Sequence, residues 1–318
     1  MHCFILAGGF ATRLWPITEK RAKPLLPLAG KPLLTHIVEG VPAGMPITVS
    51  TNAVFAESFL AWQRSIDRPV RVIIEKTNKE DEKIGAMGAL LQWMRDEKIA
   101  EDVLLLAGDN YLGFKLSDFL QHYEPGVPLL AVREIGNLED AKRFGTVIVG
   151  QDGHTMVMFE EKPKQPKSSL VSTTCSVLPA QHMDAILAYS ARSPDNPGGL
   201  WEEFLKLGIR ATCFPFTEPW FDVGSFEAYL DATKTLVGDR CIAAPTSTSH
   251  DVQSERSVVI GDRTTVRNST LRNTVLFAEC TIEDCILEDC IIDDRCVLQG
   301  IDLTGKMIRA GTVLVSRI

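Results

Sequence analysis

Apolar residues recur at intervals of five or six between residues 260 and 298, and this period restricts the fold of that segment more than any other feature of the chain. An α-helix repeats every 3.6 residues and a β-strand every two, so neither produces it. Short strands joined by tight turns into a three-sided β-helix do. Successive intervals of 6, 5 and 5 residues make one coil of 16. The recurring residues are Ile260, Val266, Leu271, Leu276, Ile282, Leu287, Ile292 and Leu298.

A small residue recurs late in each repeat, and in the last four repeats it is a cysteine. A coil of 16 puts Thr264, Cys280 and Cys296 in one column, whereas Cys285 and Cys290 belong to the other two. The four cysteines therefore do not converge on one point. Because a buried thiol behaves as a small apolar group, we interpret them as core residues rather than as a four-thiolate zinc site.

The chain before residue 240 has a different pattern, in which short apolar runs alternate with longer segments of helical period. This alternation predicts an α/β domain, with a mostly parallel, Rossmann-like sheet and helices on both faces. We predict strands at 4–6, 47–50, 70–74, 103–106, 129–132 and 146–149, and helices at 56–64, 86–96 and 225–235. A polar stretch rich in Ser, Thr and Pro follows, which predicts one domain over 1–240, a linker over 241–255 and a β-helix over 256–318.

Composition and charge narrow the function. The formal net charge of -8 argues against a general nucleic-acid binder, which needs a basic face. The sequence contains no run of 18 or more apolar residues, which is the length needed to span a bilayer. The start MHCFILAGG lacks the features of a signal peptide. We therefore expect a cytoplasmic protein that has no nucleic-acid or membrane partner and whose eight cysteines are reduced.

The first 31 residues have a net positive charge although the whole chain is acidic, since they contain five Lys or Arg residues and the single acid Glu19. Gly8 and Gly9 follow the first predicted strand, where the absence of side chains lets a backbone approach a phosphate. Arg13 and Lys23 add mobile positive charge. The segment matches neither the P-loop pattern nor GxGxxG. It suits a small polyanion, although a solvated basic surface would share the composition.

Three residue pairs in this segment have the spacing found in a known family, namely Gly8-Gly9, Thr12-Arg13 and Lys23-Pro24. The sequence LAGGFATRLWP, followed by KP, resembles the GGxGTRLxP and KP of sugar-1-phosphate nucleotidylyltransferases, with Ala11 in place of the third glycine. The resemblance implies catalytic roles for Arg13 and Lys23, which would hold the triphosphate and the departing pyrophosphate. It also implies nucleotide contacts from Leu6, Ala7, Gly8 and Gly9.

Three later motifs match the same family in the same order. VLLLAGDN and WFDVGS contain Asp109 and Asp222, which the resemblance makes the protein ligands of Mg²⁺, an ion that prefers carboxylate, phosphate and water oxygens. In FEEKP, Glu161 would take sugar hydroxyls and Lys162 would contact the sugar phosphate as a catalytic residue. A sugar 1-phosphate is already largely ionised at neutral pH, so the reaction needs no protein nucleophile or general base.

Two segments depart from the family pattern. IIEKTNKEDEKIGAMGAL keeps Gly85, which we assign to the nucleotide site, and Gly88, but it lacks the usual Gln, so the base stays open. In the sugar region Gly145 fits the family, whereas VSTT replaces VNTG. We assign Gly145 and Thr173 to the sugar site, with Thr174 standing where glycine is typical.

The resemblance covers the whole chain, because many members carry a left-handed β-helix that mediates oligomer contacts, and a homodimer or homotetramer is therefore expected. Glucose 1-phosphate with dTTP or UTP is the first expectation, and mannose 1-phosphate with GTP is the alternative. A glycosyltransferase and a nucleotide-binding subunit without turnover are rival functions. Arg13 and Lys23 argue against the glycosyltransferase, which has no triphosphate to hold. The subunit without turnover is disfavoured by the full set of Arg13, Lys23, Asp109, Lys162 and Asp222.

Overall fold

The computed structural model describes residues 1–9, 12–76 and 84–316. Ala11 and residues 77–83, which belong to the atypical segment 73–90, lie outside the described residues. The chain divides into two compact units. Among the described residues, the first unit holds 1–9, 37–76 and 84–220, and the second holds 12–36 and 221–316. Each unit is described by itself.

The centre of the first unit is a parallel sheet whose strands lie in the order β6-β1-β4-β5. These strands are β1 (His2–Leu6), β4 (Ile47–Asn52), β5 (Arg71–Glu75) and β6 (Val103–Ala107). The runs of consecutive apolar residues in β1 and β6 are typical of strands covered on both faces. All four strands were predicted within two residues of their observed bounds.

Antiparallel strands extend the sheet beyond β6, so it is mixed. β11 (Leu170–Leu178) pairs antiparallel with β6, β8 (Leu129–Glu134) and β9 (Gly145–Val149), and β10 (Met156–Glu161) forms a hairpin with β9. β12 (Thr212–Phe216) runs parallel to β8. The short connection between β9 and β10 explains their direction, since parallel strands need a longer crossover. The predicted α/β architecture is confirmed.

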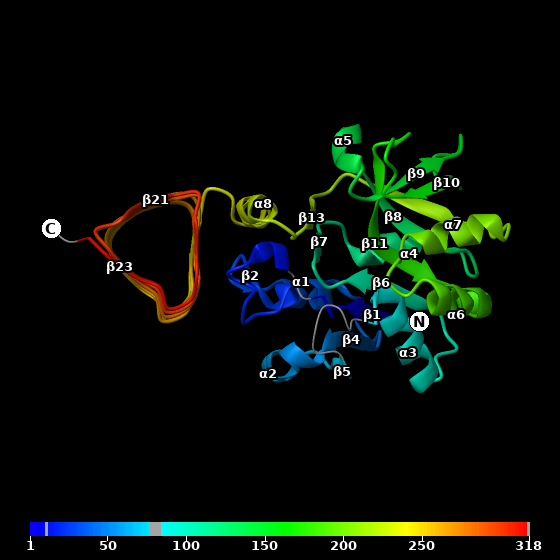
Figure 1. Ribbon diagram of the computed structural model, residues 1–318, viewed down its shortest axis with the longest axis horizontal. Coiled ribbons are helices and arrows are strands. Elements are labelled where there is room, and N and C mark those ends of the chain that lie inside the picture. The colour runs from blue at the N-terminus through cyan, green and yellow to red at the C-terminus, as the bar shows by residue number, and fades with distance from the viewer. Residues whose placement is uncertain (10–11, 77–83, 317–318) are drawn as a thin grey trace. The chain divides into compact units, whose positions relative to one another are not determined.

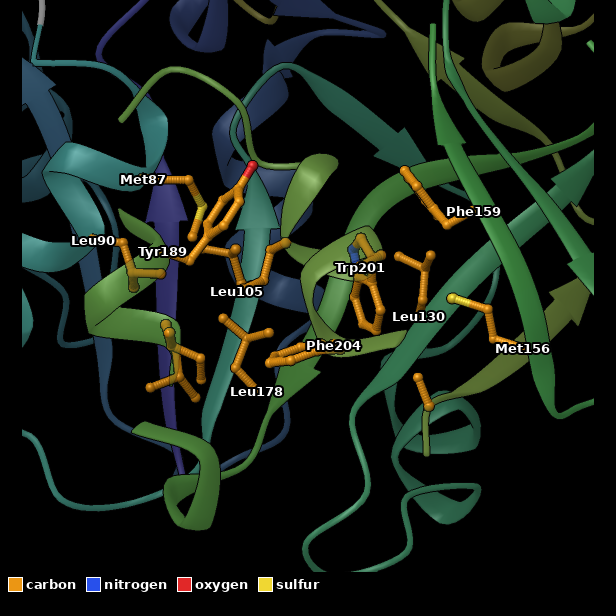
Figure 2. Packing of buried hydrophobic residues seen from close by; sticks show 14 of the residues in the cluster. Met87, Leu90, Leu105, Leu130, Met156, Phe159, Leu178, Tyr189, Trp201 and Phe204 are labelled. Atoms are coloured by element: carbon orange, nitrogen blue, oxygen red, sulfur yellow. The ribbon is translucent and has the colours of Figure 1, made fainter. Parts of the chain in front are cut away.

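Three helices pack on one face of this sheet. They are α3 (Ala86–Asp96), α6 (Met183–Arg192) and α7 (Gly199–Lys206). Their apolar side chains meet those of β1, β6, β8 and β11 in one buried cluster, part of which Figure 2 shows. α2 (Ala56–Ser65) packs against β4 and β5. Because crossovers between parallel strands are right-handed, the return from β5 to β6 puts α3 on the opposite face from α2.

Shorter elements complete the first unit. They are β7 (Asn110–Leu112), α4 (Leu116–Gln121) and α5 (Leu138–Ala141). Two elements, α1 (Leu33–Gly40) and β13 (Trp220–Asp222), cross from one unit to the other along the chain. Among the described residues, no helix has the length and apolar character needed to cross a bilayer.

The second unit contains α8 (Phe226–Val237), the hairpin of β2 (Pro27–Leu28) and β3 (Lys31–Pro32), and a stack of short parallel strands. Seen end on, the stacked strands form three flat sides (Figure 1). The strands are β14 (Cys241–Ala243), β15 (Thr248–Ile260), β16 (Thr265–Leu276), β17 (Thr281–Glu283), β18 (Ile286–Glu288), β19 (Ile291–Ile292), β20 (Val297–Gln299), β21 (Asp302–Thr304), β22 (Met307–Ile308) and β23 (Val313–Val315).

Strand register confirms the predicted coil of 16 residues. Thr265 pairs with Thr281, Thr281 with Val297 and Val297 with Val313, each 16 residues further along the chain. The paired strands begin earlier than predicted, since β14 and the start of β15 lie in the segment 241–255 that the sequence suggested was a linker. Most of the Ser and Thr residues there are exposed, which is why the segment looks polar.

The small residues of the repeats are buried donors. The hydroxyl of Thr264 donates to the carbonyl of Phe277, and the thiol of Cys280 donates to that of Asp293, in each case 13 residues further on and one coil away. The thiols of Cys285, Cys290 and Cys296 make the same bond to Leu298, Leu303 and Arg309. Within the described residues, no group of three or more His, Cys, Asp or Glu has the geometry of a metal site. These contacts support the core interpretation of the cysteines.

Candidate active site

The order of the sheet reverses at the ends of β1 and β6, where a ligand crevice is expected. The chain passes from β1 through β4 to β5 and then returns to β6 on the other side of β1, so the connections leave these two strands in opposite directions. Ligands of open α/β sheets bind at such a reversal, outside the carboxyl ends of the strands. Leu6 of β1 pairs with Ala107 of β6, and the amide of Gly108 donates to the carbonyl of Leu6 at 2.8 Å.

The predicted nucleotide residues Ala7 and Gly8 follow β1 at this crevice. The amide of Ala7 donates to the carbonyl of Ser50, and the carbonyl of Gly8 accepts from Asn52 Nδ2 at 2.9 Å. A Cβ at Gly8 would lie 2.6 Å from Glu75 Oε1, so a side chain at position 8 would displace this carboxyl group. Gly9 is exposed, and a Cβ there would meet nothing within 4 Å.

Glu75 is a site residue that the sequence analysis did not identify. It ends β5, is only 8% exposed, and accepts a hydrogen bond from Ser50 Oγ at 2.6 Å. Burial raises the pKa of Glu75, and the bond from Ser50 partly offsets the rise. The signal in the sequence was a single acid at the end of an apolar strand, but nothing in that pattern shows that the strand ends beside Gly8.

Asp109 follows β6 on the other side of the crevice. Asn110 Nδ2 donates to Asp109 Oδ1 at 2.9 Å, and the indole of Trp220 donates to Asn110 Oδ1 at 2.7 Å. These bonds orient a half-buried carboxylate at the end of a rigid strand. Gly108 is required before it, because a Cβ there would lie 2.9 Å from the carbonyl oxygen of Leu6.

Glu161 lies at the end of β10 against two glycines. A Cβ at Gly145 would lie 2.9 Å from Glu161 Oε2, and one at Gly198 would lie 1.8 Å from the same oxygen. Burial raises the pKa of Glu161, while Lys162, whose Nζ is 3.6 Å from Glu161 Oε1, lowers it. Lys162 has a left-handed φ of 45° and its side chain is 65% exposed. The predicted sugar residues Gly145, Glu161 and Lys162 are therefore neighbours.

The second unit brings together three other predicted residues. Lys23, which is 6% exposed, forms an ion pair with Asp222, with Nζ 3.0 Å from Oδ1. A Cβ at Gly224 would lie 3.4 Å from Asp222 Oδ1 and 3.5 Å from both Lys23 Nζ and Arg13 Nη2. The two cationic atoms are thus within twice that distance of each other. A glycine backbone with two cations and one carboxylate around it has the charge pattern of a site for a phosphate group and a metal ion.

Comparison with known proteins identifies the family. The model of the nucleotidyl transferase family matches residues 3–238, which is more than half of the chain. The chain belongs to the nucleotidyl transferase family. This agrees with the resemblance found in the sequence motifs.

Individual relatives have different names. A Sulfolobus acidocaldarius protein provisionally named mannose-1-phosphate guanyltransferase is 26% identical over 275 residues, covering 84% of this chain and 72% of that protein. Glucose-1-phosphate adenylyltransferase of Thermotoga neapolitana is 29% identical over 255 residues, covering 73% of this chain and 60% of its own length. A crystal structure of a Bacillus anthracis protein provisionally named glucose-1-phosphate thymidylyltransferase, in complex with sucrose, matches 74% of this chain and 94% of its own at a TM-score of 0.62 and 22% identity, which shows the fold.

The backbone at Thr174 has a conformation that suits the glycine of the family pattern better than a threonine. Its φ is 61°, and the pairing of β11 with β8 is irregular between Ser172 and Ser176. Glycine, which the family usually has at this position, adopts a left-handed φ without strain, whereas a β-branched residue does not. The preceding Thr173 is 1% exposed and donates to the carbonyl of Ala131 at 3.0 Å, so its hydroxyl already has a partner in the sheet.

Gly85 is the N-cap residue of α3 and has a packing role. Its φ is 77° and ψ is 161°, and a Cβ there would lie 2.3 Å from the carbonyl oxygen of Pro194. The same oxygen accepts hydrogen bonds from the amides of Met87 and Gly88 at 2.8 and 3.1 Å. Pro194 therefore caps α3, and Gly85 is the residue that allows the close approach.

We predict that Gly85→Ala lowers the free energy of unfolding by about 3 kcal/mol or more, because it combines a backbone clash with a φ and ψ that only glycine adopts readily. Gly153→Ala is the matched control. Its φ is 74° but a Cβ would meet nothing within 4 Å, so a cost of about 1 kcal/mol is expected. Urea denaturation of both variants measures the difference. Equal losses would mean that the contact with Pro194 is not needed.

Proposed function

We propose that this nucleotidyl transferase joins a sugar 1-phosphate to a nucleoside triphosphate and releases pyrophosphate. The observation that carries the proposal is the convergence of Arg13, Lys23 and Asp222 around Gly224. A glycosyltransferase that consumes a nucleotide sugar has no triphosphate to hold, and a subunit without turnover has no need of such a set. Since the chain spans 60% of the length of the Thermotoga relative, the complete reaction and its substrates are proposals.

In the proposed site, Arg13 and Lys23 hold the triphosphate and stabilise the charge of the leaving pyrophosphate. Asp109 and Asp222 would each offer one carboxylate to a divalent ion. The donor set suits Mg²⁺, which is usually held by one or two carboxylates together with substrate phosphates and water. When bound, the ion would neutralise phosphate charge. The link from Asn110 to Asp109 and the ion pair from Lys23 to Asp222 keep both carboxylates oriented.

The acceptor is the sugar phosphate. Lys162 is exposed and bears an ammonium group that would offset the repulsion between two anionic reactants, and Glu161 would accept hydrogen bonds from sugar hydroxyls. Gly145 completes the proposed sugar site, whereas Thr173 is left out of it, because its buried hydroxyl already donates to the carbonyl of Ala131 within the sheet. A phosphate oxygen of the sugar 1-phosphate attacks the α-phosphorus in line, so the residues act by positioning and by charge stabilisation rather than as nucleophiles.

We predict that Asp222→Asn and Asp109→Asn each lower the rate of Mg²⁺-dependent pyrophosphate release by about 100-fold or more, because removal of one preorganised charge costs that much at other sites of this kind. Release is measured with a coupled pyrophosphatase assay across a range of Mg²⁺ concentrations. Asp231→Asn, on the exposed side of α8, is the control and is expected to keep full activity. Full activity in either test variant would remove that residue from the metal site.

The base and sugar have two candidates. The sequence-based expectation is dTTP or UTP with glucose 1-phosphate, and relatives with guanylyl, adenylyl and thymidylyl names do not decide between bases. Glu75 favours GTP, the nucleotide of the alternative pair with mannose 1-phosphate. A carboxylate only accepts hydrogen bonds. Guanine offers it two adjacent donors, at N1 and the exocyclic amine, whereas the N–H of uracil or thymine lies between two carbonyl oxygens that a carboxylate repels.

We predict that Glu75→Gln lowers the ratio of kcat/KM for GTP to that for ATP by about 10-fold to 100-fold, since an amide supplies one donor and one acceptor and fits adenine better. The panel of GTP, ATP, UTP, CTP and dTTP is measured with glucose, mannose and N-acetylglucosamine 1-phosphates. Glu57→Gln, exposed on α2, is the control. An unchanged base ratio in Glu75→Gln would contradict a role in base selection.

The same variant should not unfold the chain. Burial raises the pKa of Glu75 above its value in the unfolded chain, so the wild type loses stability as the pH rises from the unfolded pKa to the folded pKa. Gln carries no charge, so the variant does not have this loss. The amide oxygen can still accept the bond from Ser50 Oγ.

We also propose that the protein acts in a reducing compartment, the cytoplasm. All eight cysteines lie among the described residues as free thiols, and seven of them are buried. A homodimer or homotetramer remains part of the proposal.

A further inference from the structure

Arg21 lies between Arg13 and Lys23 in sequence but has no role in the proposed reaction. Its guanidinium group contacts the β-helix instead. Nη1 is 3.1 Å from Asp293 Oδ1, Nη2 is 2.5 Å from Asp294 Oδ2, and the group lies over the ring of Phe277 at 4.9 Å from the centroid. A planar guanidinium that bonds two carboxylates and stacks on an aromatic ring is held in one orientation.

The two carboxylates are themselves fixed by the coil that carries them. Asp293 is 6% exposed, and its Oδ1 accepts from the amide of Asp294 at 2.8 Å. Asp294 Oδ1 accepts from the amide of Ala278 in the coil below at 3.0 Å. Burial raises the pKa of Asp293, and the charge of Arg21 opposes that rise. A buried carboxylate left without Arg21 would be poorly compensated.

A second link joins the same region to the helix that follows the metal-ligand motif. Tyr229 of α8 is fully buried, its hydroxyl donates to the carbonyl of Pro27, and its ring meets the ring of Phe277 edge-on at a centroid distance of 6.4 Å. Phe277 thus contacts both Arg21 and Tyr229. α8 begins just after Asp222 and Gly224, so the contacts of Tyr229 also hold the segment that carries the partner of Lys23.

Arg21 is close to Lys23 along a stiff piece of chain. Residues 23–25 form a 3-10 turn that contains Pro24, and the amide of Leu25 donates to the carbonyl of Ala22 at 2.9 Å. Lys23 is buried and pairs with Asp222, so it has little freedom to compensate for a shift of the turn. A displacement of Arg21 is therefore passed to the ammonium group of Lys23.

We propose that the β-helix is a positioning element of the active site, in which Asp293 and Asp294 act through Arg21 to hold Lys23 against the pyrophosphate group. Arg21, Asp293 and Asp294 are positioning residues. This inference rests on the proposed function and assigns to the β-helix a task within the reaction, separate from any role in oligomer contacts.

The experiment uses the full chain in the reverse direction, with Mg²⁺-pyrophosphate and the nucleotide sugar that the wild type turns over. In Arg21→Gln, KM for pyrophosphate should rise about 10-fold, while KM for the nucleotide sugar stays within about twofold. Asp294→Asn is the milder variant, since its amide oxygen can still accept from Ala278, and should show the same pattern to a smaller extent. Arg21→Lys, which keeps the charge, should recover part of the affinity.

The control is another ion pair between the same two parts of the second unit. Arg309 bonds Glu19 at 2.5 and 2.7 Å, but its side chain is 54% exposed, so Arg309→Gln should leave both KM values unchanged. Melting temperatures are recorded for every variant. A brace without a positioning role would lower the melting temperature and the active fraction, and hence kcat, with both KM values unaltered.

The outcomes separate the two claims. A selective rise in KM for pyrophosphate in Arg21→Gln and Asp294→Asn supports the inference. Unchanged KM values in folded Asp294→Asn and Arg21→Gln, or an equal rise for both substrates, would overturn it while the proposed function stands. If the wild type releases no pyrophosphate with any pair of substrates, the proposed function itself fails.

Discussion

The second unit depends on one buried ammonium group. Lys23 is 6% exposed, and a charge in such a place needs a partner of opposite sign. Its partner is Asp222, almost two hundred residues further along the chain. This pair draws the start of the chain toward the segment before α8, and Tyr229 and Arg21 extend the attachment to the β-helix. Arg13 and Lys23, which are proposed to hold the triphosphate, therefore belong to the same compact unit as the β-helix, although they lie near the N-terminus.

The first unit has a different organisation, in which rigid strands deliver the site residues. β1 and β6 end side by side where the order of the sheet reverses, and Gly8 and Asp109 follow those ends directly. At two points the chain packs so closely that there is no room for a side chain, at Gly108 against Leu6 and at Gly145 against Glu161. These glycines let carboxylates and backbone approach one another more closely than any other residue would allow.

Much of this arrangement could be predicted from the sequence, because it rests on local patterns. The β-helix follows from a period of five to six residues, and the strands β1, β4, β5, β6, β8 and β9 follow from runs of apolar residues. The antiparallel strand β11 was missed, since its sequence LVSTTCSVL mixes apolar and small polar residues and is interrupted by the irregularity at Thr174.

What could not be predicted depends on contacts between distant residues. Nothing near Glu75 in the sequence indicates that it lies against Gly8, and nothing near Arg21 indicates that Asp293 and Asp294 receive it. The segment 241–255 looked like a linker because most of its side chains are polar and exposed, and only the pairing of β14 and β15 shows that it belongs to the coil. The cysteines looked like small core residues, and their thiol bonds to the next coil appear only in three dimensions.

The central claim is that a phosphate oxygen of the sugar 1-phosphate attacks the α-phosphorus of the nucleotide directly. It is tested by using a sugar 1-phosphate whose phosphate oxygens carry ¹⁸O and following the products by ³¹P NMR, in which each ¹⁸O shifts the signal of the attached phosphorus. The account predicts that all of the label appears in the nucleotide sugar, including the oxygen between its two phosphorus atoms, and that the pyrophosphate is unlabelled. Label in pyrophosphate or in inorganic phosphate would contradict it.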